Sequence, residues 1–366
     1  MEEGTFSTVL AKHFDDYPLR KFPSVMEFEL SNVCNMACVM CDGRYSSVIR
    51  KEREMLPPIH NPYNAGFVLQ LEEFIPHLSK AKFQGGEPFL IPIYYDIWEK
   101  ILEVNPNCVI SVQTNGSVLN ERIKKLLEKG NFHITVSVDA ASEEVFDTIR
   151  LKGDFTQVIS NIQYFQSLCK SKNAYFGVAT CPMQQNWHEI PDIIRTCNDM
   201  DAEITFNRVW HPPNCALWSC SENKLLEILT NYEKIDLQGN SGTALHNKKQ
   251  FDELVSQIQL WTEKAKKNET MQAALNELDN EALKNILLNR MLRQADIELA
   301  GNENTVDRDV LITRFEKVFD QLSASINYRS MLVKLNDIPG EVLVREFSNN
   351  TEEVLLSQAK EYLKEF

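Results

Sequence analysis

Three cysteines lie close together near the start of the chain, in the spacing CxxxCxxC: Cys34, Cys38 and Cys41. They follow an extended, partly apolar run at residues 25–30. A loop with this spacing can point three sulfur atoms into one cavity, and soft thiolates gathered in this way select an iron–sulfur cluster or zinc. A cubane cluster has four irons, so three cysteines leave one iron without a protein ligand. An open metal position is a place where chemistry can occur.

The same thiols allow three other interpretations. Cys38 and Cys41 alone form a CxxC pair of the thioredoxin kind, which leaves Cys34 without a role. A zinc site needs a fourth ligand, and no nearby CxxC or HxxxH supplies one. Buried structural thiols are the simplest alternative, because free cysteine packs as a small hydrophobic side chain.

Further motifs follow the cysteine loop. They are Phe83-Gln84-Gly85-Gly86-Glu87-Pro88, Gln113-Thr114-Asn115-Gly116, Ser137-Val138-Asp139 and Thr148-Ile149-Arg150. With CxxxCxxC, their order and spacing resemble the radical S-adenosylmethionine (radical SAM) superfamily over about residues 24–210, and Phe-Gln before GGEP resembles its sulfatase-maturase-like (SPASM/twitch) branch. The cysteine-rich extension that holds auxiliary clusters in that branch has no counterpart, since Cys220 is the last cysteine. We therefore expect a single cluster.

The resemblance implies a set of cofactor ligands. Cys34, Cys38 and Cys41 would ligate three irons of a [4Fe–4S] cluster, and S-adenosylmethionine would chelate the fourth. Members of the superfamily cleave S-adenosylmethionine with one electron, supplied by a reductant such as flavodoxin or ferredoxin, to a 5′-deoxyadenosyl radical that removes hydrogen from a substrate. The other cofactor-binding candidates are Gln84, Gly85, Gly86, Glu87, Pro88, Asn115, Ser137 and Arg150.

The residue types in these motifs suit such a ligand. Gly85 and Gly86 would let the backbone approach its methionine end, where a side chain would clash. Glu87 could accept a hydrogen bond from its ammonium group, and the Arg150 fork can pair with two carboxylate oxygens. An ordinary strand-to-helix turn, a surface arginine and a turn asparagine are the non-functional alternatives.

One more cysteine, Cys181, is predicted to end a strand on the side where the radical would form. A thiol S–H bond is weak enough to return a hydrogen atom to a carbon radical, and radical SAM epimerases use a cysteine in this way. Cys181 is therefore the catalytic candidate, and a packed cysteine is the alternative. Candidate substrate contacts from the same rim are Trp187, His188, Arg208 and His211.

The elements that must position these motifs follow from hydrophobic periodicity. The predicted strands are residues 25–30, 81–84, 108–113, 132–138, 175–180 and 203–209. The predicted helices between and after them are residues 66–78, 93–104, 120–128, 142–150, 155–171, 187–200 and 225–232. This alternation predicts an α/β fold with a parallel sheet, a partial (β/α)6 TIM-type barrel, as the resemblance also implies. The motifs then fall at the C-terminal strand ends, where barrel enzymes gather catalytic groups; residues 42–64 are predicted as a loop over the site.

The composition changes after the barrel. A stretch rich in Gly, Asn and Ser predicts a linker, and the remainder is helical in pattern, which predicts a helical C-terminal domain. The expected organisation is an N-terminal arm at residues 1–23, a barrel at 24–236, a linker at 237–247 and a helical domain at 248–366.

Composition also limits the class of protein. Hydrophobic residues make up 43% and charged residues 25% of the 366 residues, as in ordinary globular proteins. The absence of a long apolar run argues against a membrane span, and the net charge of −14 argues against nucleic-acid and anionic membrane partners. The N-terminus lacks a secretory signal, and the cluster loop would be ruined by oxidation, so we expect a cytoplasmic protein.

We therefore expect a radical SAM enzyme that abstracts hydrogen from a peptide or natural-product substrate. One alternative is a radical epimerase or dehydratase that acts on a sugar-like or nucleoside small molecule with Cys181 as the hydrogen donor. Another, from a different class, is a non-catalytic cluster-binding protein whose helical domain binds a partner. Intact Gly85, Gly86 and Glu87 argue against that last alternative.

Overall fold

The computed structural model describes residues 21–237, 239, 241–301, 307–325, 327–336 and 338–362. It divides into two compact units, Met1–Thr262 and Glu263–Phe366. The predicted N-terminal arm, residues 1–23, lies outside the described residues except at its end. Within the described ranges, no helix combines the length and the apolar character needed to cross a bilayer.

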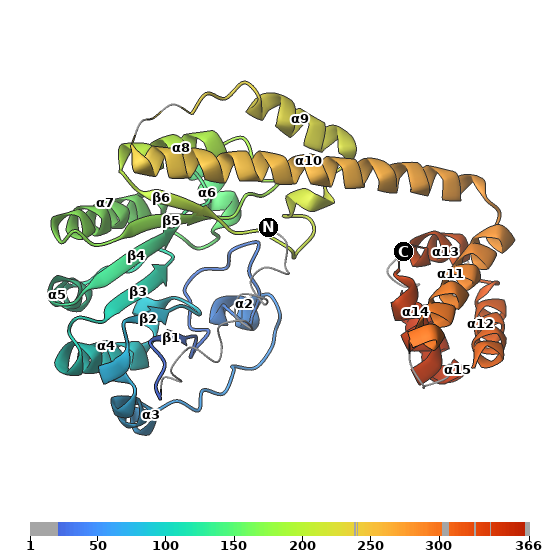
Figure 1. The fold of residues 1–366 in the computed structure, drawn as a ribbon, viewed down its shortest axis with the longest axis horizontal. Helices are drawn as coiled ribbons and strands as arrows, with labels where there is room; N and C mark the ends of the chain where they lie inside the picture. Colours follow the sequence, from blue (N-terminus) through green and yellow to red (C-terminus); the bar gives the residue numbers. More distant parts are fainter. Residues whose placement is uncertain are drawn as a thin grey trace. The chain divides into compact units, whose positions relative to one another are not determined.

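The first unit is built on one sheet of six parallel strands, which follow one another in chain order (Figure 1). They are β1 (Val25–Phe28), β2 (Lys80–Phe83), β3 (Val109–Thr114), β4 (Phe132–Ser137), β5 (Phe176–Thr180) and β6 (Glu203–Phe206). Parallel neighbours cannot be joined by a tight turn, so each connection crosses over through helical segments. The predicted partial (β/α)6 barrel is confirmed.

Helices fill the connections, and α4, α5 and α7 lie along one side of the sheet (Figure 1). Their bounds are α2 (Ser47–Glu52), α3 (Ala65–Gln70), α4 (Pro92–Val104), α5 (Glu121–Lys129), α6 (Glu143–Ile149), α7 (Phe155–Ser171) and α8 (Ile190–Asp199), with 3-10 turns η1 (Leu71–Glu73), η2 (Ile75–His77), η3 (Pro88–Leu90) and η4 (Leu217–Ser219). The single helix predicted at residues 66–78 is instead α3 followed by η1 and η2. Pro76 explains the break, because it cannot donate the hydrogen bond that a continuing helix requires.

The segment predicted as a loop at residues 42–64 contains helix α2. Ser46 caps it: the Ser46 hydroxyl accepts from the backbone N–H of Ile49 at 3.3 Å and donates to the carbonyl oxygen of Met36 at 2.7 Å. Ile49 is its one buried residue. A helix this short with one buried apolar residue shows no helical periodicity, which is why the sequence pattern did not indicate it.

An aromatic cluster packs α4 onto the sheet. The Trp98 ring lies edge-on to Phe83, Phe89 and Phe132, with ring centroids 5.5, 5.7 and 5.8 Å apart. Trp98 is 1% exposed. Edge-to-face pairs of this kind add to the free energy gained from burying the rings, so they fix α4 against β2 and β4.

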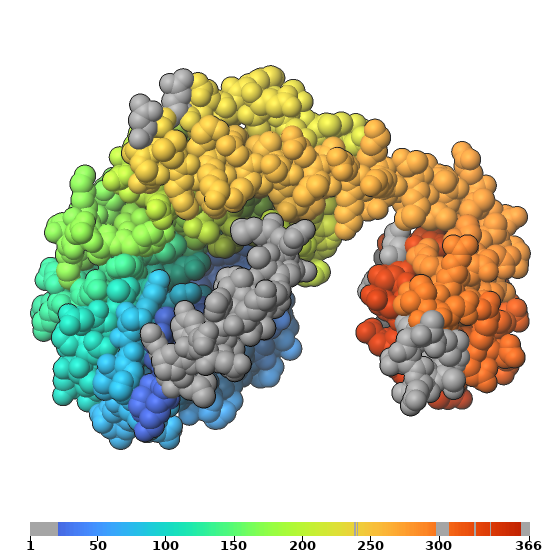
Figure 2. All heavy atoms as spheres, viewed as in Figure 1, coloured from blue at the N-terminus to red at the C-terminus, as the bar shows by residue number. Residues whose placement is uncertain are grey.

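Two more helices, α9 (Glu222–Tyr232) and the first part of α10 (Gly242–Glu277), follow β6. In Figure 2 their yellow atoms form one continuous surface with the green atoms of the barrel. Asn247 of α10 accepts from the N–H of Ile204 and donates to the carbonyl of Ala202, at 2.8 and 2.9 Å, and so satisfies the free edge of β6. The first unit thus ends inside α10, at Thr262, whereas composition placed the break at residues 237–247.

The second unit has its own core and is wholly helical over its described residues. It holds the end of α10 together with α11 (Asn280–Gly301), α12 (Arg308–Leu322), α13 (Tyr328–Leu335), α14 (Gly340–Asn349) and α15 (Glu352–Tyr362). The core is apolar, with Phe315, Phe319 and Phe347 in mutual ring contact. The predicted helical C-terminal region is confirmed.

Candidate functional site

A cavity of about 570 Å³ opens among the loops that follow all six strands. Its volume lies within the roughly 300–1,000 Å³ typical of ligand sites. Its wall holds all but two of the residues predicted as metal ligands, cofactor contacts or the catalytic group: Cys34, Cys38, Cys41, Gln84, Gly85, Gly86, Asn115, Ser137, Arg150 and Cys181. We call this space the central cavity.

Helix α2 fastens the start of the cysteine loop. The hydroxyl of Ser47 accepts from the Cys34 N–H and lies equally near the Cys34 carbonyl, both at 3.2 Å. Two residues on, Ser46 holds the Met36 carbonyl through its capping hydroxyl. The first cysteine is therefore positioned by the N-terminus of a helix that is only six residues long.

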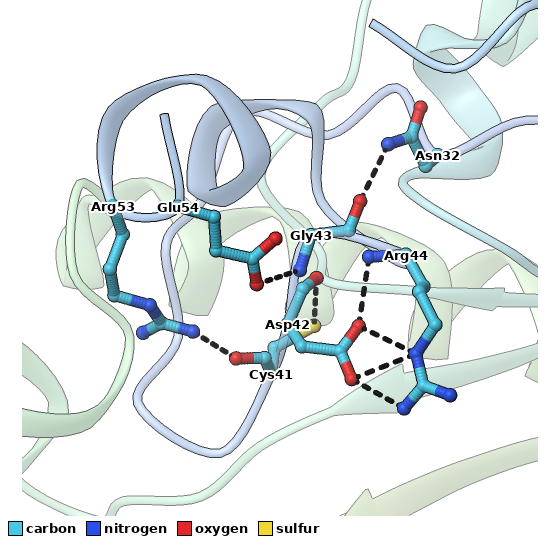
Figure 3. Close-up of polar contacts among 7 residues, drawn as sticks. All are labelled: Asn32, Cys41, Asp42, Gly43, Arg44, Arg53 and Glu54. Atoms are coloured by element: carbon cyan, nitrogen blue, oxygen red, sulfur yellow. Dashed lines mark hydrogen bonds and ion pairs between the residues drawn. The ribbon is translucent and has the colours of Figure 1, made fainter. Parts of the chain in front are cut away.

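The residues just after α2 fasten the other end of the loop (Figure 3). The Arg53 guanidinium donates to the carbonyl oxygens of Cys38, at 3.4 Å, and Cys41. The Glu54 carboxylate accepts from the N–H of Gly43 at 2.7 Å. No sequence motif marked Arg53 or Glu54, because each acts on backbone atoms that only the folded loop brings within reach.

Gly43 is needed at the centre of this arrangement. A Cβ atom there would lie 2.8 Å from the Cα of Arg50, inside contact distance. Its carbonyl also accepts from the Asn32 side chain at 2.9 Å (Figure 3). Beside it, Arg44 pairs with Asp42 at 2.6 Å, and these hydrogen bonds lower the pKa of the Asp42 carboxyl.

The three thiols are held in surroundings that favour their neutral form. Burial raises the pKa of Cys34, that of Cys38 to about 11 and that of Cys41 to about 12. Metal binding to thiols like these must displace their protons. In the described part of the chain, no three Cys, His, Asp or Glu side chains lie close enough to share a single metal ion. The ligands of one zinc ion converge on that ion, whereas cluster cysteines bind different irons.

The two glycines after β2 allow the chain to pack closely on itself. Gly85 has φ +110°, and a Cβ atom on Gly86 would lie 2.1 Å from the Val33 carbonyl oxygen. The Gly86 N–H donates to the carbonyl of Ser31, and the Glu87 N–H donates to that of Val33, at 2.9 and 2.7 Å. Both glycines therefore dock the β2 loop against the chain just before the cysteine loop, and both also line the central cavity.

Glu87 and Pro88 are the two predicted cofactor-binding residues that are not on the cavity wall. Glu87 is fully buried and bridges two loops. One carboxylate oxygen accepts from the Thr114 hydroxyl and the Phe89 N–H, at 2.7 and 3.1 Å, and the other from the Asn115 N–H at 2.7 Å. Burial raises the pKa of Glu87 to about 7, although these hydrogen bonds oppose the shift. In this structure Glu87 holds Asn115 in place.

Glu87→Gln should destabilise the first unit by about 1–3 kcal/mol, because an amide NH₂ cannot accept from Phe89 while it donates to Thr114. A protonated carboxyl can do both. The pKa of Glu87 is raised in the folded state, so protonation of Glu87 stabilises the fold. This contribution to the free energy of unfolding is complete below about pH 4.5 and is lost as the pH rises through about 7. Urea unfolding followed by tryptophan fluorescence should therefore show a larger penalty at pH 6 than at pH 8. An equal penalty at both pH values would contradict this assignment.

Asn115 lies beside the first cysteine. Its side-chain NH₂ donates to the Asn35 side chain at 3.1 Å and lies 3.8 Å from the Cys34 sulfur. Its side-chain oxygen accepts from the Ser117 N–H at 2.9 Å. With both ends of the amide fixed, Asn115 keeps its side-chain NH₂ within hydrogen-bond reach of the Cys34 sulfur.

A buried ion pair lies at the back of the cavity. The Arg150 guanidinium lies 2.6 Å from the Asp139 carboxylate, with side chains 5% and 0% exposed. Burial opposes the Arg150 charge, but attraction to Asp139 and Cys38 outweighs it and raises the pKa of Arg150. Asp139 also accepts from the Cys181 N–H at 2.7 Å. The Arg150 Nε is buried without a hydrogen-bond partner among the described residues.

The outer wall of the cavity comes largely from the loop after β6. It includes Arg208 and His211, two of the predicted substrate contacts, and Trp210, which is 59% exposed. Trp187 and His188 are not on this wall; the Trp187 ring instead packs near Tyr232. Asp139, Arg53 and Trp210 were not singled out as site residues from the sequence.

Comparison with known proteins points to one superfamily. The profile of the radical SAM superfamily matches residues 28–197. A GTP 3′,8-cyclase of Limosilactobacillus fermentum is 26% identical over 248 residues, 63% of this chain and 69% of that protein. A probable GTP 3′,8-cyclase of Methanocaldococcus jannaschii is 27% identical over 179 residues, 48% of this chain and 56% of that protein. A cysteine-type anaerobic sulfatase-maturating enzyme of Clostridium novyi is 36% identical over 90 residues, 22% of this chain and 24% of that protein. The match thus spans 69% and 56% of the lengths of these two cyclases.

Two solved structures are similar to this chain. Native anSMEcpe with bound AdoMet has a TM-score of 0.42 and 17% identity, over 57% of this chain and 59% of that one. SuiB of Streptococcus suis bound to S-adenosylmethionine has a TM-score of 0.43 and 14% identity, over 62% of this chain and 50% of that one. Both likenesses are weak.

Proposed function

Since this chain belongs to the radical SAM superfamily, whose members use a [4Fe–4S] cluster and S-adenosylmethionine, we propose that it abstracts hydrogen from a peptide or natural-product substrate. When bound, the two cofactors supply one-electron cleavage of a carbon–sulfur bond and thereby a hydrogen-abstracting radical. The observation that carries the proposal is the gathering of Cys34, Cys38 and Cys41 on one cavity wall with the other motif residues.

The residues of this chain have distinct parts in that reaction. The three cysteine thiolates would hold the cluster, and the Arg150 guanidinium on the same wall would pair with an anionic group of S-adenosylmethionine. Gln84 and Ser137 line the same wall and offer further polar contacts. The sheet and the loops that fill the inner end of the cavity exclude water, which protects a reactive radical from side reactions.

The substrate enters from the rim formed by the loop after β6. Trp210 offers an exposed aromatic face there, beside Arg208 and His211. The related proteins are named for action on GTP and for maturation of a sulfatase, so both small molecules and polypeptides occur among the relatives. The exposed rim supports a substrate that extends out of the cavity, as a peptide does.

The direct test is formation of 5′-deoxyadenosine by the anaerobic, iron-loaded chain with S-adenosylmethionine and a chemical reductant. We expect turnover with one cluster, about four irons per chain. An iron-loaded chain that forms no 5′-deoxyadenosine would instead be the non-catalytic cluster protein. All nine cysteines are free, as is usual in a reducing compartment, and this supports a cytoplasmic location. A one-electron donor of the flavodoxin or ferredoxin kind would then reduce the cluster.

A second candidate function, radical epimerisation or dehydration of a sugar-like or nucleoside substrate, is supported by the position of Cys181. This thiol lies on the same wall as the cluster cysteines, and its backbone is fixed by Asp139. Burial raises the pKa of Cys181, so it keeps its S–H hydrogen at neutral pH. That is the form that can donate a hydrogen atom.

Cys181→Ala should abolish hydrogen return while 5′-deoxyadenosine formation continues. The measurement is a reaction in D₂O with a low-molecular-mass extract of the producing cells, followed by mass spectrometry. Wild type should produce a species that gains one deuterium, because the thiol exchanges with solvent, and the variant should not. Cys197→Ala, a buried thiol in α8, is the matched control. If Cys181→Ala formed the same deuterated species, Cys181 would not be the hydrogen donor.

A further inference from the structure

A second cavity lies beside the residues that lead into the cysteine loop. This outer groove has a volume of about 620 Å³, and its wall includes Val33, Ser47, Lys51, Leu56, Ile59 and Tyr63. It shares no wall residue with the central cavity. Cofactor chemistry in the central cavity therefore leaves the outer groove without an assigned role.

A wall residue of the outer groove is the direct chain neighbour of a cluster cysteine. Val33 lines the groove, and the next residue, Cys34, lines the central cavity. Ser47, also on the groove wall, is hydrogen-bonded to the Cys34 backbone at 3.2 Å. The two cavities share no wall residue, so a substrate in one has no direct path to the other. An electron can still pass between them, because electron transfer needs proximity and not an open path.

The groove presents apolar side chains to solvent. Leu56, Ile59 and Tyr63 are 45%, 46% and 38% exposed, and they come from one segment of chain between α2 and α3. Exposed apolar residues scattered singly are ordinary, whereas several around one hollow mark an interaction surface.

The charge beside the groove is opposite to that of the whole chain. The groove wall carries two cations, Arg50 and Lys51, and one acid, Glu52, in a chain of net charge −14. The acid, Glu52, is paired with Lys152. Lys51 is exposed and lies on the groove wall. An acidic partner would thus be repelled by most of the molecule and attracted here.

We propose that the outer groove is the docking surface for a small acidic carrier protein that delivers one electron to the cluster. The carrier is oxidised by one electron, the cluster gains that electron, and no atom is transferred. The proposal rests on the proposed function for the presence of the cluster. Charge complementarity and closeness to Cys34 favour a carrier over a substrate, which must reach the central cavity.

The test is the rate of cluster bleaching in the anaerobic, iron-loaded full chain, mixed with reduced flavodoxin as the acidic carrier. Lys51→Glu should lower the second-order rate constant about tenfold at low ionic strength, Lys51→Gln should fall between, and added salt should shrink these differences. Lys125→Glu, the same change on an exposed residue of α5, should not change the rate. Reduction by photoreduced 5-deazaflavin, a small neutral donor, should be equal in all variants.

Equal flavodoxin rates for Lys51→Glu and Lys125→Glu would overturn the proposal, as would a loss with deazaflavin that matches the loss with flavodoxin. Bleaching requires no cleavage of S-adenosylmethionine, so it still reports on docking if 5′-deoxyadenosine never forms. A failure of docking and a failure of the proposed function are therefore told apart.

Discussion

Replacing any one of Cys34, Cys38 and Cys41 by alanine should remove the cluster, and with it all formation of 5′-deoxyadenosine. Each thiolate would bind a different iron, so the loss of one sulfur leaves two irons without protein ligands. Iron and sulfide analysis after anaerobic reconstitution, with chromatography of the nucleoside product, measures both effects.

Cys220→Ala is the matched control, because Cys220 is a partly buried thiol that does not line the central cavity. It should keep about four irons per chain and full cleavage. A cysteine-loop variant that keeps the wild-type iron content would contradict the assignment of that cysteine as a ligand.

Arg150→Ala should destabilise the first unit by about 3–5 kcal/mol, because it leaves the fully buried Asp139 carboxylate without its counter-charge. All five tryptophans lie in the first unit, so urea unfolding followed by tryptophan fluorescence reports on that unit alone. Adding Asp139→Asn should recover part of the loss, since the asparagine oxygen can still accept from the Cys181 N–H while carrying no charge.

Arg195→Ala supplies the comparison. Arg195 pairs with Asp192 on the surface of α8, with side chains 49% and 60% exposed, and exposed pairs contribute less than about 1 kcal/mol. Equal losses of stability in the two arginine variants, or a further loss on adding Asp139→Asn, would show that the buried pair does not stabilise the first unit as predicted.

Much of the barrel could be predicted from local sequence. All six strands were found because short runs of β-branched and apolar residues alternate with helical stretches, and each signal lies within a few residues of chain. The same holds for the cysteine loop, whose spacing is itself the signal. Helix α2 escaped prediction because one buried isoleucine gives no period, and the predicted linker overlapped α10 because the Asn247 contact with β6 spans more than forty residues.

The same distinction between local signals and long-range contacts applies to the functional site. Residue types at fixed spacing indicated which side chains would gather around the cavity, whereas the part played by Glu87 depended on contacts with residues 114 and 115. The glycine pair was predicted to make room for a ligand, and its nearest neighbours are the carbonyls of Ser31 and Val33.

The sequence by itself determined the kind of chemistry, the order of the strands and the end of the sheet where the motifs meet, because periodicity and motif spacing are local properties of the chain. Tertiary structure alone decided that Arg53 holds the cysteine carbonyls, that Arg150 pairs with Asp139 and that an outer groove lies beside the start of the cysteine loop. Those features depend on distances between segments far apart in the chain, and such distances are set only once the sheet has formed and the core is buried.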